Sequence, residues 1–224
     1  MESPKKALFA EFAAVARALG SEHRLDLLEH IAQGEQSVEL LAERTGIPFA
    51  SVSQHLQALR KAGLVSARRD GRRVLYRIAD DSVLRLLSSL RQVAERQVAE
   101  VERIVAGYFR DRDSLEPVSR KELTARIKDG LVTVLDVRPE DEFTAGHLPG
   151  AVNIPLSQLR KRLPDLPKGQ EVVAYCRGPW CVLAFEAVAL LREEGRKARR
   201  LDGGLPEWKI AGLPVEVTKT RERA

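Results

Sequence analysis

Apolar residues in the first third of the chain recur at the spacing of amphipathic helices. The spacing predicts four helices, over residues 7–19, 25–31, 38–44 and 49–61. Ser37 is placed to cap the third helix, and Gly46 and Gly63 follow the last residues of the third and fourth. We therefore expect a compact helical region at the start of the chain.

The pattern changes to alternation over residues 64–78, where Val74, Tyr76 and Ile78 recur with period two. Asp70-Gly71 in the middle of this segment is a strong hairpin turn signal. Two short helices followed by a β-hairpin are the pattern of a winged helix-turn-helix, with the hairpin as the wing. The first domain is therefore predicted to be mainly α with a β-hairpin wing.

Residues 82–108 carry apolar side chains near heptad spacing and predict one long helix. It could lie across its own domain as a core helix. We favour a helix that forms a homodimer, because the apolar stripe is too long for one small domain to cover.

Strands and helices alternate in the second half, after a charged segment over 110–117 that ends in proline. Helices are predicted at 119–129, 156–163, 182–194 and 206–211, and strands at 132–137, 171–175 and 198–201. This order predicts an α/β domain with a mostly parallel sheet and helices on both faces. The expected organisation is a first domain over 1–109, a linker over 110–117, a second domain over 118–217 and a tail over 218–224.

A length of 224 residues suits two domains. No stretch is apolar for long enough to span a membrane, and the N-terminus has no pattern of a secretory signal, so we expect a cytoplasmic protein without membrane partners. The net charge of +5 says little about partners, but residues 60–77 hold seven basic side chains against one acid, Asp70.

That basic segment includes the outward face of the helix over 49–61, which is predicted to enter the major groove of DNA. Small or polar side chains there can meet base edges, and the nearby basic side chains can meet phosphates. The base-edge candidates are Ser51, Ser53, Gln54, His55 and Gln57. The phosphate candidates are Arg60, Lys61, Arg68, Arg69, Arg72 and Arg73. The alternative is an ordinary amphipathic surface helix with some wing arginines on a solvated face.

Residues 13–108 resemble the ArsR family of winged-helix repressors, through L-G-S-E-H-R-L-D-L-L, S-V-S-Q-H-L-Q-A-L-R-K-A-G-L-V and R-R-D-G-R-R-V-L-Y-R. The resemblance implies a homodimer that binds a palindromic double-stranded DNA operator and releases it when an inducer arrives. Many members sense metals through cysteines before the recognition helix, or through histidines and carboxylates on the dimer helix. Residues 38–44 hold no cysteine, and residues 82–108 hold no cysteine or histidine, so we expect no metal and no cofactor. His23 and His30 are interpreted as ordinary packing or surface residues.

The only two cysteines, Cys176 and Cys181, stand in a C-R-G-P-W-C segment between a predicted strand and a predicted helix. Too few and too local for a disulfide framework, they point to reactive thiol chemistry. The end of a parallel strand, the N-terminus of the following helix and Arg177 would together stabilise a thiolate, so a lowered pKa is predicted for Cys176. The alternative is a buried, inert cysteine.

Residues 118–217 resemble rhodanese domains, through L-D-V-R-P-E-D-E-F-T-A-G-H-L-P-G-A-V-N-I-P, Y-C-R-G and L-D-G-G-L-P-E-W in the family's order. The resemblance implies that Cys176 carries a persulfide taken from a small donor such as polysulfide, thiosulfate or a persulfide. It also implies that Asp136 and Arg138 brace the loop or pocket. Glu142 and His147 are expected to be structural.

Two departures from the family pattern concern the same loop. Pro179 removes one backbone donor, and the position five after Cys176 holds Cys181. Related phosphatases close a longer loop with arginine where this chain has Val182, so phosphatase activity is not expected. Cys181 is either a resolving thiol that forms a disulfide or polysulfide link with Cys176, or a side chain packed at a helix start. Trp180 is expected to be a pocket wall or a partner contact.

Three functions remain open from the sequence. The first is a DNA-binding transcriptional regulator, most simply a repressor, whose rhodanese domain senses reactive sulfur. The second is a sulfurtransferase enzyme that acts through Cys176 and regulates its own expression. The third is a regulator that responds to a thiophilic metal or arsenite through Cys176 and Cys181.

Overall fold

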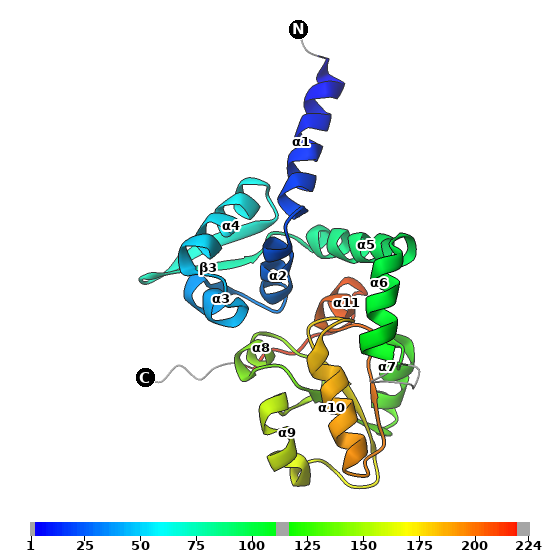
Figure 1. Cartoon of the computed structure of the whole chain (residues 1–224). Helices are drawn as coiled ribbons and strands as arrows, with labels where there is room; N and C mark the ends of the chain where they lie inside the picture. Colours follow the sequence, from blue (N-terminus) through cyan, green and yellow to red (C-terminus); the bar gives the residue numbers. More distant parts are fainter. Residues whose placement is uncertain (1–2, 111–116, 219–224) are drawn as a thin grey trace. The chain divides into compact units, whose positions relative to one another are not determined.

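The computed structural model describes residues 3–110 and 117–218, without the side chains of residues 109 and 110 (Figure 1). The chain divides by its contacts into two units, Met1–Arg85 and Leu86–Ala224. Most of the predicted linker over 110–117 and of the tail over 218–224 lies outside the described residues. The domain boundary therefore stays a prediction.

Four helices form the first unit as predicted, namely α1 (Pro4–Leu19), α2 (Glu22–Ile31), α3 (Val38–Thr45) and α4 (Phe49–Lys61). Ser37 caps α3, since its hydroxyl accepts a hydrogen bond of 3.3 Å from the Leu40 N–H. The apolar faces of α2, α3 and α4 meet in a core in which Leu27, Leu41 and Leu56 are fully buried.

The predicted wing is a hairpin of β2 (Val65–Asp70) and β3 (Arg73–Ile78), paired antiparallel. Gly71 lies in the turn with a φ of 58°, a conformation that costs glycine little. A short strand, β1 (Gln36–Ser37), pairs with the other edge of β3 and gives the order β1-β3-β2. Strand β1 was not predicted, because two residues are too few to show alternation.

The predicted single helix over 82–108 is wrong. The chain forms α5 (Asp81–Gln97), α6 (Ala99–Ile104) and a π-helix, η1 (Val105–Arg110). Val98 separates α5 from α6 with extended dihedrals, φ −111° and ψ 103°, and its carbonyl accepts the 3.3 Å hydrogen bond of the Glu102 N–H. The apolar pattern runs through the break without glycine or proline, so periodicity could not reveal it.

Four parallel strands form the sheet of the second unit, in the order β5-β4-β6-β7. The strands are β4 (Val132–Asp136), β5 (Val152–Asn153), β6 (Glu171–Tyr175) and β7 (Ala198–Arg200). The helices are α7 (Arg120–Lys128), α8 (Glu140–Ala145), α9 (Leu156–Arg162), α10 (Val182–Glu193) and α11 (Leu205–Ile210), with a short 3-10 turn at Leu163–Asp165. The α/β prediction is confirmed, although α8 and β5 lie where only a loop was expected.

The alternation of β6 divides the core of this unit into two parts. Val172, Ala174 and Cys176 lie in one cluster with side chains of α9 and α10. Val173 and Tyr175 lie in the other, with side chains of α7 and α11. Because strand side chains alternate between faces, the position after β6 directs Cys176 toward α10.

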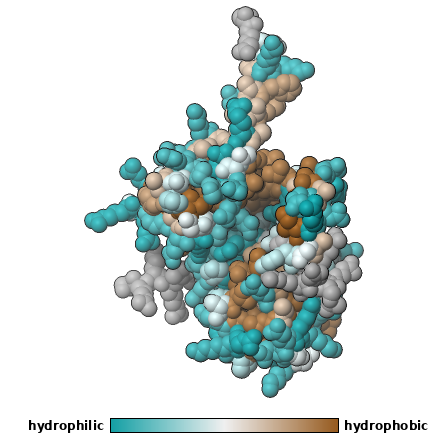
Figure 2. Space-filling view, viewed as in Figure 1, coloured by the Kyte–Doolittle hydropathy of each residue, from teal (hydrophilic) through white to brown (hydrophobic). Residues whose placement is uncertain are grey.

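Some apolar side chains remain exposed on helix surfaces. On α1, Leu8, Phe9 and Phe12 are 56–62% exposed, and Figure 2 shows apolar colour along this helix. On α5, Leu86, Leu90 and Val93 are 40–60% exposed. None of the described helices is both long and apolar enough to cross a membrane.

Candidate functional site

The cysteine loop, Cys176–Cys181, joins the end of β6 to the start of α10, as predicted. Cys176 is completely buried, and Cys181 is 8% exposed at the N-cap of α10. The Cys176 thiol donates to the carbonyl oxygen of Cys181, 3.4 Å from Sγ, and lies 3.8 Å from that of Gly178. The loop thus brings both thiols into one buried site.

The two thiols have opposite electrostatic surroundings. Burial raises the pKa of the Cys176 thiol, and its hydrogen bond with Cys181 raises it further, although the Gly178 and Ala184 amides oppose this. The lowered pKa predicted for Cys176 is therefore not found in this closed loop. Complete removal from water disfavours the thiolate more than the loop dipoles favour it.

The pKa of the Cys181 thiol is lowered instead. The hydrogen bond from Cys176 has the largest effect, burial opposes it, and the amides of Arg177 and Leu183 with the Arg177 charge lower the pKa further. Cys181, at the start of a 12-residue helix, therefore receives the anion stabilisation that the sequence analysis assigned to Cys176.

Arg177 is anchored by a buried carboxylate. Its Nη2 donates to Oε1 of Glu142 at 2.7 Å, and its Nε contacts both carboxylate oxygens at 3.0 and 3.1 Å. Glu142 belongs to α8 and is fully buried. Glu142 was predicted to be structural, but its contact with Arg177, the residue next to Cys176, was not predicted.

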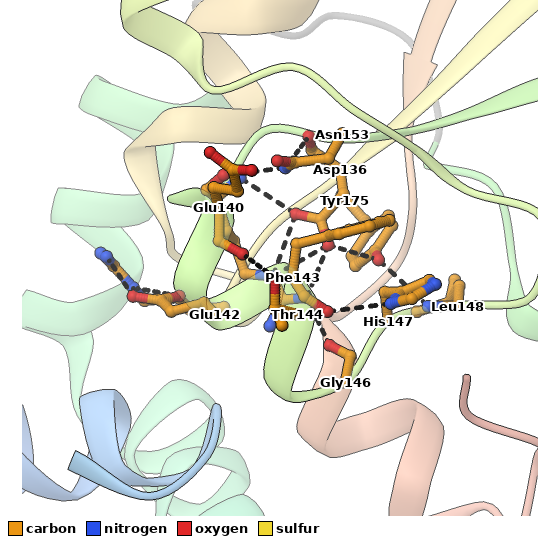
Figure 3. A network of polar contacts seen from close by, with 12 residues as sticks. Asp136, Glu140, Glu142, Phe143, Thr144, Gly146, His147, Leu148, Asn153 and Tyr175 are labelled. Carbon is orange, nitrogen blue, oxygen red and sulfur yellow. Dashed lines mark hydrogen bonds and ion pairs between the residues drawn. The ribbon is translucent and has the colours of Figure 1, made fainter. Parts of the chain in front are cut away.

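Asp136 and Arg138 form a second buried network together with Tyr175. Nε of Arg138 lies 3.0 and 3.1 Å from the two Asp136 oxygens, and its Nη2 donates to the Gly146 carbonyl at 2.8 Å. The Tyr175 hydroxyl donates to Asp136 at 2.5 Å and accepts from the Leu148 N–H at 3.1 Å, as the dashed lines in Figure 3 show. The network brings Asp136 and Arg138 together beside Tyr175, the residue before Cys176.

Electrostatics keeps Arg138 charged within this network. Burial alone would lower the pKa of Arg138, but the adjacent Asp136 carboxylate raises it above its ordinary value. Burial raises the pKa of Tyr175, so its hydroxyl remains a donor. His147 lies at the edge, with Nδ1 2.8 Å from the Phe143 carbonyl and its ring stacked on Phe143.

Gly204 packs directly against the cysteine loop, a role that the sequence analysis missed. A Cβ at this position would lie 2.6 Å from the backbone carbon of Arg177 and the nitrogen of Gly178. The Leu205 N–H donates to the Cys176 carbonyl at 3.4 Å. The consecutive glycines 203 and 204 were the available signal, because such a close approach admits only glycine.

The predicted DNA-reading side chains lie on α4 and the wing. Val52, Leu56 and Leu59 are buried, as expected for the inner face of α4. Four of its outward candidates, Gln54, Gln57, Arg60 and Lys61, are exposed, whereas Ser51, Ser53 and His55 are half-buried. The face predicted to meet DNA is therefore polar and accessible along most of its length.

His55, one of these candidates, has neighbours in the first unit. The His55 ring lies 5.6 Å from that of His23, and burial together with Arg24 and His23 lowers the pKa of His55. These surroundings favour the neutral form of the His55 imidazole.

In the wing, Arg68 forms a salt bridge of 2.6 Å with Glu35. Arg69, Arg72 and Arg73 are exposed. Among the described residues, no three histidine, cysteine or acidic side chains gather as metal ligands.

Comparisons with known proteins identify both halves of the chain. Residues 21–67 match the arsR family of bacterial regulatory proteins, and residues 119–211 match the rhodanese-like domain. A sulfurtransferase of Allochromatium vinosum is 30% identical over 100 residues, which cover 44% of this chain and 92% of the relative. A solved homodimeric winged helix-turn-helix DNA-binding domain from Mycobacterium bovis is 42% identical, with a TM-score of 0.42, and covers 44% of this chain and 91% of that chain.

One relative extends over both halves. An HTH-type transcriptional regulator of Mycobacterium tuberculosis is 44% identical over 212 residues, which cover 95% of this chain and 93% of the relative. Through this likeness and the two family matches, the chain belongs to the arsR family of transcriptional regulators, and it carries a rhodanese-like domain.

Proposed function

We propose that this regulator senses reactive sulfur, which its rhodanese-like domain takes up on Cys176 and which changes its affinity for DNA. The observation that carries the proposal is the pair of thiols in one buried loop, with Sγ of Cys176 3.4 Å from the Cys181 carbonyl. The chain has no other cysteine, so the winged half has no thiol of its own with which to sense sulfur.

The first chemical step transfers one sulfur atom. The Cys176 proton passes to the Cys181 thiolate, and the Cys176 thiolate attacks the terminal sulfur of an inorganic polysulfide. A new S–S bond forms on Cys176, and an S–S bond of the donor breaks. The shortened polysulfide leaves with the electron pair, and Cys176 becomes a persulfide.

The second step links the two cysteines. Cys181 loses its proton to solvent, attacks Sγ of Cys176 and expels hydrosulfide, which leaves a Cys176–Cys181 disulfide. The two thiols are oxidised and the sulfane sulfur is reduced, so the electrons balance. A thiol reductant supplies two electrons and restores the starting state.

The DNA-binding part of the proposal is a homodimer on an operator. The outward side chains of α4 would meet base edges, and the exposed basic side chains of α4 and the wing would meet phosphates. The exposed apolar side chains of α1 and α5 would be buried against a second copy of the chain. Arg68 contributes less than the other wing arginines, because Glu35 holds it.

Fluorescence anisotropy of the protein on DNA from upstream of its own gene tests the proposal. We expect polysulfide to lower the affinity about tenfold, which corresponds to about 1.4 kcal/mol, and a thiol reductant to restore it. The Cys176→Ser variant should bind as the reduced wild type does and ignore polysulfide. Polysulfide turnover with no change in DNA affinity would instead indicate a sulfurtransferase with a DNA-binding domain that answers another signal.

A further inference from the structure

We infer that Arg91 and Glu95, on the C-terminal part of α5, are positioning residues of the cysteine loop. Both belong to the second unit of the chain, which begins at Leu86. Both lie outside residues 119–211, the part that matches the rhodanese-like domain. The inference rests on the proposed function, since it names the element that holds the sulfur site closed.

Glu95 holds the loop at its C-terminal end. The indole Nε1–H of Trp180 donates to Oε1 of Glu95 at 2.7 Å. Trp180 directly precedes Cys181, so this hydrogen bond restrains the residue next to the thiol with the lowered pKa. A carboxylate acceptor makes the bond stronger than one between neutral groups.

Arg91 restrains the other end of the loop through α11. Its Nη1 contacts Oε1 of Glu207 at 2.8 Å, while Oε2 of Glu207 accepts the Gly204 N–H at 2.9 Å. Gly204 is the glycine whose backbone packs against Arg177 and Gly178. The Arg91 guanidinium also lies 3.7 Å from the Cβ position of Gly178, so it borders the loop directly.

The two restraints come from one face of α5, because residues four apart are neighbours on a helix. Arg91, Glu95, Trp180 and Glu207 also line one pocket of about 390 Å³. Neither cysteine lines it, since Cys176 is completely buried and Cys181 nearly so. The loop must therefore move before a sulfur donor can reach either thiol.

An added sulfur atom on Cys176 would displace its neighbours, because Cys176 is completely buried and protein interiors are close-packed. Displacement of the loop breaks the Trp180–Glu95 hydrogen bond or shifts α5. Since α5 begins at Asp81 in the first unit and ends at Gln97 in the second, it connects the loop to the winged half through one continuous helix. Sulfur uptake and the position of α5 are thus linked in both directions.

Alkylation of the reduced, full-length protein tests the positioning role without any sulfur donor. In Glu95→Ala, iodoacetamide should modify the two cysteines about tenfold faster than in the wild type. This ratio corresponds to a loss of about 1.4 kcal/mol in the stability of the closed loop relative to the open loop. Glu95→Gln should restore the slow rate, because its amide oxygen still accepts from the indole. Exposed Glu102 provides the matched control, and Glu102→Ala should react as the wild type does.

An unchanged rate in Glu95→Ala, or a Glu95→Gln variant as fast as Glu95→Ala, would overturn the inference. DNA anisotropy then separates it from the proposed function. If polysulfide lowers the DNA affinity of the wild type, Glu95→Ala should still take up sulfur, but its DNA affinity should change little. If the wild type does not respond, the proposed sensing fails, while the alkylation rates still decide whether Glu95 holds the loop.

Discussion

Cys176 and Cys181 differ in burial and in the effect of the hydrogen bond between them, which raises the pKa of Cys176 and lowers that of Cys181. Cys176 is surrounded by apolar side chains of α10 and donates its proton toward carbonyl oxygens. Cys181 stands at the helix start and receives hydrogen bonds from Cys176 and from backbone amides. The direction of each pKa follows from this difference, because a thiolate needs donors when it has no water.

The first prediction concerns this pair. Iodoacetamide reacts with the thiolate, so we expect Cys181 to be alkylated before Cys176 at neutral pH. Because the pKa of Cys181 is lowered, its rate should rise at a lower pH than that of free N-acetylcysteine, and the rate of Cys176 at a higher pH. Peptide mass spectrometry after short exposures at several pH values measures both. Faster modification of Cys176 throughout would contradict the assignment.

The charged residues near the cysteine loop show which contacts could be predicted from the sequence. Asp136 and Arg138 were predicted to brace the loop or pocket; they lie together in a buried network with Tyr175, and the bracing role stays a prediction. The contact between Glu142 and Arg177 could not be predicted, because the two residues are 35 positions apart and only the fold brings them together.

At the scale of elements, the basic side chains of the wing differ in how strongly other residues hold them. Arg69, Arg72 and Arg73 extend from β2, the turn and β3 into solvent, whereas Arg68 of β2 is held by Glu35. A guanidinium that is already paired with a carboxylate releases fewer counterions when it meets a phosphate.

The second prediction follows from that inequality. Replacement of both Arg72 and Arg73 by alanine should weaken DNA binding and reduce the slope of log affinity against log salt by up to about two. Arg68→Ala, in the same hairpin, is the comparison. It should reduce the slope by less than about one, the change expected for the loss of one phosphate contact. Anisotropy titrations at several salt concentrations measure the slopes. Equal changes per arginine would show that the Glu35 salt bridge does not restrain Arg68.

Two helical segments, α4 and residues 82–108, show what the hydrophobic pattern can and cannot predict. Helix α4 begins and ends at the predicted residues, because its apolar face and terminal signals lie within or next to its own sequence. The prediction of one helix over 82–108 was wrong, because the apolar stripe continues through Val98 although the backbone there is extended. Periodicity records which face is apolar, and it does not record whether the backbone stays helical.

At the scale of the whole molecule, the chain has two units whose buried residues can be perturbed one at a time. Leu56 of α4 and Leu191 of α10 are both fully buried, the first in Met1–Arg85 and the second in Leu86–Ala224. Both tryptophans, Trp180 and Trp208, belong to the second unit. Tryptophan fluorescence therefore reports on that unit alone.

The third prediction uses this placement. Leu191→Ala should destabilise the second unit by about 2–5 kcal/mol and shift the tryptophan-detected transition in urea to a lower concentration. Leu56→Ala should lower the free energy of unfolding of the first unit by a similar amount. We expect the helix signal and DNA binding to decrease, with little change in the tryptophan-detected transition. A tryptophan transition shifted equally by both substitutions would show that the chain unfolds as one cooperative whole.

The sequence by itself determined the order of most helices and strands, the α/β nature of the second half, the polar face of α4 and the place of the cysteines between a strand and a helix, but it did not reveal β1, α8, β5 or the break at Val98. These features depend on local periodicity and on residues close together in the chain. Only the tertiary structure decided which thiol has the lowered pKa, which carboxylate holds Arg177, and which residues of α5 restrain the cysteine loop. Those properties arise from burial and from contacts across as many as 116 positions, as between Arg91 and Glu207, which no local pattern records.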